Sequence, residues 1–159
     1  MKTVYIGLGS NLGDRAANLG EARRRMQEIG VLISRESSIF ETAPQDIIDQ
    51  PRFLNQVIQA ATDCLPRQLM TRLLRLERDM GRRRSVPKGP RSIDLDILYY
   101  GDSLVTIPGL EIPHPRIRER RFVLEPMAEL APDLRDVRQG LTVRQMLVTV
   151  TDQSVKRWP

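Results

Sequence analysis

Cysteine, histidine and aromatic residues are scarce in this sequence of 159 residues. Cys64 is the only cysteine, so no disulfide can form within the chain, and a reducing compartment is expected. With a single histidine, His114, the sequence has no second cysteine or histidine for a nucleophilic dyad or a zinc site. Cys64 is therefore predicted to be a small buried hydrophobic residue.

Long apolar runs are also absent. No stretch approaches the ~20 apolar residues that cross a membrane, and the beginning of the chain turns polar at Ser10 and Asn11 without the apolar core of a signal peptide. We expect a soluble, cytoplasmic protein without a membrane partner. Because neither the apolar fraction nor the Gly and Pro counts are extreme, collagen-like and disordered chains are excluded. The expectation is one domain over 1–159, acting as a monomer.

Lysine is rare among the basic residues. Three of the 25 are lysines, which leaves 22 arginines, and the formal net charge is +5. Arginine binds phosphate and carboxylate groups in a forked geometry that lysine does not have. GC-rich coding DNA would also enrich arginine, and the composition does not separate a nucleotide from a nucleic acid as the ligand.

An RNA-binding module is the alternative that the arginines suggest. Proteins that bind RNA on a sheet surface stack bases on several exposed aromatic residues, whereas this chain has three Phe and three Tyr. Strong, salt-dependent retention on RNA without ATP binding would favour this alternative.

Hydrophobic periodicity predicts an α+β fold. In chain order the predicted segments are a strand at 4–8, a helix from an Asp14 cap to 29, β-type runs at 31–41 and 53–62, a helix from Pro66 to 80, a strand at 92–100, a short helix at 123–130, and a last helix from a Thr142–Gln145 capping box to about 148. The order β-α-β-β-α-β, with additions at the C-terminal end, indicates a ferredoxin-like sandwich.

Two aspartates on the strand at 92–100 are the clearest candidates for chemistry. Asp94 and Asp96 would point to the same face, with Cα atoms roughly 6.6 Å apart. Two ionised carboxylates at this spacing repel each other by about 2–3 kcal/mol at an effective dielectric constant near 20, so a cation is expected opposite them. A pair of oxygen ligands suits Mg²⁺. The alternative is that both face solvent or pair with Arg91 and other arginines.

A basic loop leads into this strand. It holds Arg82, Arg83, Arg84, Lys88 and Arg91. Arginines on a mobile loop can close over a phosphoryl group and neutralise its charge during transfer. The alternative is a solvated loop or one that contacts RNA, but next to the two aspartates a polyphosphate site is favoured.

Glycines follow the first strand, in the spacing G-x-G-x-x-x-G over 7–13. This spacing differs from the dinucleotide-binding pattern, and no Walker-type lysine follows it. We interpret the segment as a tight turn that approaches a ligand.

Three further residues are weaker candidates. Phe53 and Asn55 would alternate onto one face of a strand, where an aromatic ring beside an amide suits a flat heterocycle; the alternative is a core phenylalanine and an edge asparagine. His114 lies between two prolines, just before a group of arginines at 116–121. A lone histidine of this kind is either structural or an anion contact.

Four blocks of sequence occur together in this chain. They are YIGLGSNLGD at 5–14, FLN at 53–55, GPRSIDLDIL at 89–98, and IPHPR at 112–116 with RRFVL at 120–124. In these blocks and their order, over about residues 4–134, the sequence resembles the 6-hydroxymethyl-7,8-dihydropterin pyrophosphokinases of the folate pathway.

The resemblance implies an enzyme that transfers the β,γ-diphosphate of ATP to the hydroxymethyl group of the pterin and releases AMP. It implies ATP as co-substrate, no nucleic acid partner, and two Mg²⁺ ions bound by Asp94 and Asp96. Arg82 and Arg91 would steady the transferring group. A related enzyme that moves a single phosphoryl group would instead release ADP.

The same resemblance assigns the remaining site residues. Phe53 and Phe122 would hold the pterin ring between them, and Asn55, with Thr42 and Ala43, would bind its polar edge. ATP contacts are implied for six residues: Glu77, Arg84, Arg91, Ile97, His114 and Arg120. Some members carry a Trp in the basic loop where this chain has Lys88, and its only tryptophan is Trp158 in the tail. No role is assigned to 46–52.

Overall fold

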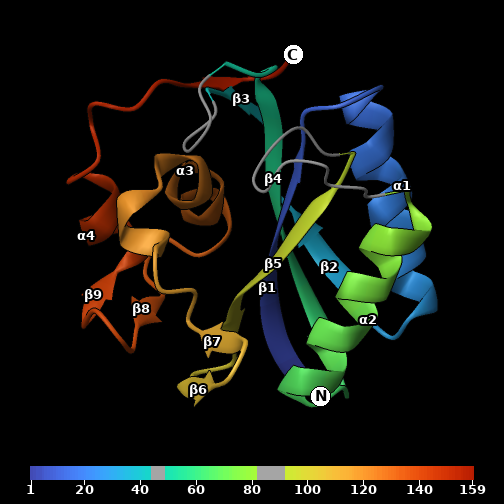
Figure 1. Cartoon of the computed structure of the whole chain (residues 1–159). Coiled ribbons are helices and arrows are strands. Elements are labelled where there is room, and N and C mark those ends of the chain that lie inside the picture. Colours follow the sequence, from blue (N-terminus) through green and yellow to red (C-terminus); the bar gives the residue numbers. More distant parts are fainter. Residues whose placement is uncertain (44–48, 82–91) are drawn as a thin grey trace.

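The chain forms one six-stranded sheet with helices on both of its faces (Figure 1), together with two small two-stranded sheets. The computed structural model describes residues 1–43, 49–81 and 92–159. Its first part contains β1 (Lys2–Ser10), α1 (Arg15–Glu28), β2 (Leu32–Glu36), β3 (Phe40–Thr42), β4 (Phe53–Thr62), α2 (Pro66–Asp79) and β5 (Asp94–Tyr100). Its second part contains β6 (Val105–Ile107), β7 (Leu110–Ile112), a 3₁₀ helix (Ile117–Glu119), α3 (Arg121–Leu130), β8 (Arg135–Asp136), β9 (Leu141–Thr142), α4 (Val143–Leu147) and β10 (Val155–Arg157).

The main sheet is antiparallel, with the strand order β10-β3-β4-β1-β5 and β2 paired farther along β4. The strands before α1 and after α2 therefore lie side by side, and the strand before α2 lies on the other side of β1. This is the arrangement of a ferredoxin-like β-α-β-β-α-β unit, so the predicted fold class is confirmed.

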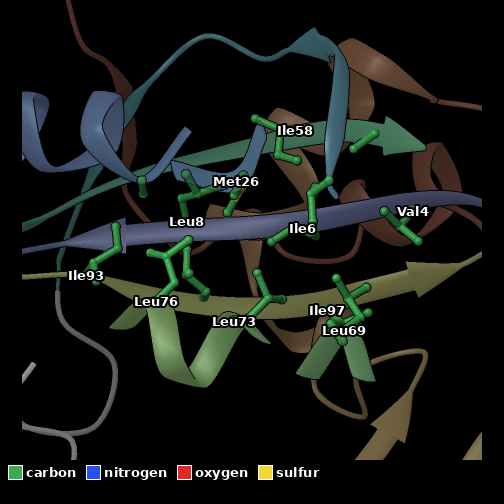
Figure 2. Packing of buried hydrophobic residues seen from close by; sticks show 14 of the residues in the cluster. Val4, Ile6, Leu8, Met26, Ile58, Leu69, Leu73, Leu76, Ile93 and Ile97 are labelled. Carbon is green, nitrogen blue, oxygen red and sulfur yellow. The ribbon is translucent and has the colours of Figure 1, made fainter. Parts of the chain in front are cut away.

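One face of the sheet is covered by α1 and α2, which lie on the same side in Figure 1. Val4, Ile6 and Leu8 alternate along β1 and point into this layer, where they meet Met26 of α1 and Leu73 of α2 (Figure 2). The alternation arises because successive strand residues face opposite sides. This layer is the larger of two hydrophobic clusters and fixes β1 and β5 beneath α2.

The opposite face is covered in part by α3 and α4. Val57 of β4 and Leu98 of β5 pack there against Val123, Leu124 and Met127 of α3. The sheet is thus buried on both sides near its middle. The first turn of α3 lies on the face of β5 that carries Asp94, Asp96 and Leu98.

Local signals place the beginnings of α1, α2 and α4 as predicted. The Asp14 side chain accepts a hydrogen bond from the backbone N–H of Ala17 (3.1 Å) and caps α1. Pro66 is the first residue of α2. Thr142 and Gln145 form the reciprocal capping box of α4.

The predicted run at 31–41 is divided into two strands. β2 pairs with 58–61 of β4, and β3 pairs with 53–55. Between them Ser37 uses its hydroxyl to accept the N–H of Val57 (2.9 Å), in place of continuous ladder pairing. Across the part of the chain that the structure describes, no helix has the length and apolar character needed to cross a membrane.

Candidate active site

Strand register brings residues from four strands onto one face of the sheet. Asn55 of β4 lies opposite Gly9 of β1, which in turn lies opposite Asp94 of β5. On the other side of β4, Thr42 of β3 is paired with Phe53. Directly opposed residues share a face, so the predicted ring-binding residues and the predicted metal ligands lie on the same surface.

Two glycines keep this surface flat between β4 and β5. Gly7 and Gly9 are the β1 residues opposite Asp96 and Asp94. A Cβ atom on Gly9 would lie 3.0 Å from Oδ1 of Asn55, which is closer than normal packing allows, whereas a Cβ atom on Gly7 would lie 3.6 Å from the Leu98 side chain. Gly9 therefore lets β1 approach the Asn55 amide closely, without a shift of that side chain.

The Asn55 amide is held in place from the neighbouring strand. Its Nδ2 donates a hydrogen bond of 2.6 Å to Oγ1 of Thr42, and both side chains are buried. Phe53, also buried, lies beside the same amide on β4. An oriented amide next to an aromatic ring can bind the polar edge of a flat heterocycle. Ala43 follows directly after β3 and is exposed.

Asp94 and Asp96 alternate with buried residues of β5. Ile93, Leu95 and Ile97 belong to the hydrophobic layer under α2, while the two carboxyl groups are half-buried on the opposite face. Within 1–43, 49–81 and 92–159, no group of three or more His, Cys, Asp or Glu side chains is placed to hold a metal ion. A pair of carboxylates matches Mg²⁺, which usually takes one or two protein carboxylates and completes its shell with water and phosphate oxygens.

A cavity of about 360 Å³ opens along the outer edge of β5. Its polar lining comprises Asp96, Glu111 and His114, and its apolar walls include Ile97, Leu74 and Ile107. The cavity therefore joins one of the two aspartates to an apolar space large enough for a nucleobase and its sugar.

His114 is held as a neutral side chain at this cavity. Burial, together with the nearby guanidinium groups of Arg120 and Arg116, lowers its pKa to about 4, while Asp94 opposes this shift. Its Nδ1 accepts the backbone N–H of Arg116 (3.2 Å). In the neutral ring the proton is then on Nε2, which gives the cavity a hydrogen-bond donor without a titrating charge.

The lowered pKa predicts an acid-dependent loss of stability. Between pH 6.5, the ordinary pKa, and about 4, the unfolded chain binds a proton at His114 that the folded chain does not. Acidification through this interval should therefore cost on the order of 1–3 kcal/mol of unfolding free energy. Urea unfolding of the wild type and His114→Gln at pH 7 and pH 4 checks this, because the difference between the two proteins should change by that amount. An unchanged difference would contradict the lowered pKa.

Arg120 and Phe122 mark the beginning of α3. The guanidinium carbon of Arg120 lies 5.6 Å from the centre of the Phe122 ring, within the range of a cation–π contact. Arg120 is also close enough to His114 to lower its pKa. The first turn of α3 thus joins a predicted ring-binding residue to the polar side of the cavity.

Glu77 has a backbone partner on the strand of the aspartates. Its carboxylate, 3% exposed, accepts the N–H of Leu95 at 2.7 Å. Leu95 lies between Asp94 and Asp96, so Glu77 of α2 fixes the strand at the point where the two carboxyl groups project. The prediction of a direct ATP contact for Glu77 stays a prediction.

Three predicted site residues lie outside the described residues: Arg82, Arg84 and Arg91. The described residues bring the others together as two groups, one on β3 and β4 and the other around β5, His114 and Arg120. Asn11, for which no role is predicted, is buried and donates from Nδ2 to Oε1 of Gln50 (2.9 Å) and to the carbonyl of Pro51 (3.0 Å). A polar residue directly after an apolar strand was the available signal.

Comparisons with known proteins give one consistent result. The model of the 7,8-dihydro-6-hydroxymethylpterin-pyrophosphokinase (HPPK) family matches residues 5–132. The chain is 39% identical, over 99% of its length and 99% of the relative's, to a 2-amino-4-hydroxy-6-hydroxymethyldihydropteridine pyrophosphokinase of Methylorubrum extorquens. It is 49% identical over 80% of its length to a mitochondrial folate synthesis bifunctional protein of Pisum sativum.

The chain spans about a quarter of the length of the plant bifunctional proteins it matches, 25% and 23% of two of them. Among solved structures, wild-type Plasmodium falciparum HPPK-DHPS with pteroate is similar with a TM-score of 0.74. That match covers 93% of this chain and 42% of the other, at 15% identity. It supports the fold.

Proposed function

Because the chain belongs to the 7,8-dihydro-6-hydroxymethylpterin-pyrophosphokinase family, we propose that it transfers diphosphate from ATP to 6-hydroxymethyl-7,8-dihydropterin. The products are AMP and the pterin diphosphate, an intermediate of folate biosynthesis. The family predicted from the sequence blocks is thereby confirmed. The observation that carries the proposal is the register across β4, β1 and β5, which puts Asn55 and Asp94 on one surface with Gly9 between them.

The pterin is proposed to bind at the β3–β4 side of this surface. Asn55 and Thr42 would hydrogen-bond the N–H and C=O edge of the ring, with the backbone around Ala43 completing the contact. Phe53 and Phe122 would cover the two faces of the ring. The hydrogen bond between Asn55 and Thr42 supports this assignment, because it orients the amide before the pterin arrives.

ATP is proposed to occupy the cavity along β5. The apolar walls beside Ile97 suit the adenine and ribose, and the triphosphate would then extend past His114 toward Asp94 and Asp96. The neutral His114 would donate from Nε2 to an anionic oxygen. Arg120, at the start of α3, supplies positive charge on the same side.

Asp94 and Asp96 are proposed to hold two Mg²⁺ ions through carboxylate oxygens. When bound, the metal neutralises phosphate charge and polarises the β-phosphorus. In the reaction the pterin hydroxyl oxygen forms a bond to the β-phosphorus, the bond from that phosphorus to the bridging oxygen of AMP breaks, and the hydroxyl proton is lost. Arg82 and Arg91, with help from Arg84, would stabilise the charge that builds up in transfer; for these three the support is the sequence resemblance.

We further propose that the 159 residues act as one domain and as a monomer on small-molecule substrates in the cytoplasm. Both layers of the fold share a single sheet, which supports one domain. The one cysteine, Cys64, is buried, as predicted from the sequence.

Identification of the nucleotide product tests the activity. Purified protein is incubated with ATP, Mg²⁺ and 6-hydroxymethyl-7,8-dihydropterin, and the products are separated by chromatography. The proposal expects AMP that appears only with the pterin, together with the pterin diphosphate. Pterin-dependent ADP would indicate transfer of a single phosphoryl group, and no pterin-dependent product from a folded sample that binds ATP would exclude this acceptor.

Substitution of Gly9 tests the pterin side. Gly9→Ala places a Cβ atom 3.0 Å from Oδ1 of Asn55 and must displace the amide by a few tenths of an ångström. We expect the KM for the pterin to rise roughly 3- to 10-fold with the KM for ATP nearly unchanged. Gly7→Ala is the matched control, since its Cβ atom makes an ordinary contact of 3.6 Å with Leu98. Equal pterin KM values for the two variants would argue against Asn55 as the recognition residue.

A further inference from the structure

The C-terminal segment at 151–158 contacts both sides of the proposed pterin site. It lies beyond residues 5–132, the part matched by the family model, and no role is predicted for it from the sequence. In Figure 1 it runs in red from α4 past α3 to the sheet at β3. One end of the segment bonds to the beginning of α3, and the other end pairs with β3.

Gln153 makes the contact with α3. Its Oε1 accepts the backbone N–H of Arg121 (3.0 Å), and its Nε2 donates to the carbonyl of Glu119 (2.6 Å). These two backbone groups flank Arg120, the N-cap residue of α3, whose own side chain makes no capping hydrogen bond. The first N–H groups of a helix have no partner within it, so Gln153 supplies one from a distant part of the chain.

The other end of the segment supports the opposite side of the site. β10 pairs with β3 in a register that places Val155 opposite Thr42. Trp158 extends this contact. Its backbone N–H donates to the carbonyl of Ile39 (2.8 Å), and the centre of its indole ring lies 5.1 Å from the guanidinium carbon of Arg15. β3 is therefore enclosed between β4 and β10 rather than left as a sheet edge.

Arg15 connects this end to the entrance of β4. Its Nη1 forms an ion pair with Glu41 of β3 (2.8 Å) and also donates to the carbonyl of Arg52 (3.0 Å). Arg52 directly precedes Phe53. The segment at 151–158 thus reaches Phe122 through Gln153 and reaches Phe53 and Thr42 through β10 and Trp158.

From these contacts we propose that Gln153 is a positioning residue for pterin binding. It holds the first turn of α3, and with it Phe122, at a fixed place relative to Thr42 and Phe53 on the sheet. A glutamine fits this position because it supplies an acceptor for Arg121 and a donor for Glu119 at once. The inference rests on the proposed function, since it names what keeps the two sides of that site together.

Direct pterin binding tests this role. Gln153→Ala removes both hydrogen bonds, and we expect the Kd for 6-hydroxymethylpterin, measured by its fluorescence with Mg²⁺ and the non-reacting α,β-methylene analogue of ATP, to rise about 3- to 10-fold. Gln139→Ala is the matched control. The Gln139 side chain accepts a hydrogen bond from Arg118 (3.3 Å), which lies next to Glu119 on the 3₁₀ helix before α3. It should change the Kd less than twofold.

A second variant separates positioning from general stability. Gln153→Glu keeps an acceptor for the Arg121 N–H at a helix N-terminus, where negative charge is favourable, but it places an oxygen in place of the donor to the Glu119 carbonyl. It should therefore recover only part of the pterin affinity that Gln153→Ala loses. Equal Kd values for the wild type and Gln153→Ala, measured well below the melting temperature of both, would overturn the inference even if Gln153→Ala unfolds more easily. Failure of the wild type itself to bind the pterin would overturn the proposed function, which is a different result.

Discussion

Asp94→Ala and Asp96→Ala are each expected to lower kcat on the order of 10³-fold or more without unfolding the protein. The two side chains project half-buried from β5, on the face opposite its core residues. Removing one therefore leaves the hydrophobic layer intact while it takes away half of the proposed metal ligands. Pterin-dependent AMP formation and the thermal melting curve, measured on the same preparations, check both parts of the expectation.

The choice of controls makes this expectation specific for metal binding. Asp102→Ala removes an exposed carboxylate just after β5 and should leave kcat within about twofold, as expected for a surface change. Asp94→Asn keeps the size of the side chain but lowers its affinity for Mg²⁺, so raising the Mg²⁺ concentration should recover part of its activity. Normal turnover in either alanine variant would exclude the metal role of that residue.

The order of the elements could be predicted because each of the first strands and helices has its own periodicity. Val4, Ile6 and Leu8 alternate, and the Asp14 cap and the first-turn proline Pro66 are local signals that tertiary contacts do not override. A chain with the element order β-α-β-β-α-β can fold into few compact topologies. The ferredoxin-like arrangement could therefore be predicted from the order alone.

The short strands could not be predicted in the same way. β10 has three residues, and it exists because β3 offers it an unpaired edge more than a hundred positions earlier in the chain. Alternation over three residues carries no signal, and the pairing partner is set by the tertiary structure. The division of 31–41 into β2 and β3 has a similar origin, in the contact of Ser37 with Val57.

For the site, the sequence predicted which residues share a face within a strand but not which strands lie together. The alternation of Asp94 and Asp96 required only β5. That Asn55 would lie level with Asp94 depends on the register of two strand pairs through Gly9, and register is not visible in one sequence. The contacts of Gln153 and Glu77 are long-range for the same reason.

Glu77→Ala is expected to reduce both activity and stability. The buried carboxylate accepts the N–H of Leu95, between the two aspartates. Its loss leaves that N–H without this partner, which costs about 1–3 kcal/mol of unfolding free energy. A small displacement of β5 would also misplace Asp94 and Asp96, and we expect kcat/KM to fall roughly 10- to 100-fold. Urea unfolding and AMP formation measure the two effects.

Glu77→Gln distinguishes positioning from a direct contact with ATP. Glutamine retains an oxygen that can accept the Leu95 N–H but carries no charge, so a positioning role predicts that it recovers most of the activity lost in Glu77→Ala. A carboxylate facing the triphosphate would be repelled by it, which favours positioning on physical grounds. Asp79→Ala, at an exposed site on the same helix, controls for the loss of a negative charge. If Glu77→Gln is as inactive as Glu77→Ala while its stability is normal, the negative charge itself is required. That result would favour the direct ATP contact implied by the family resemblance over positioning.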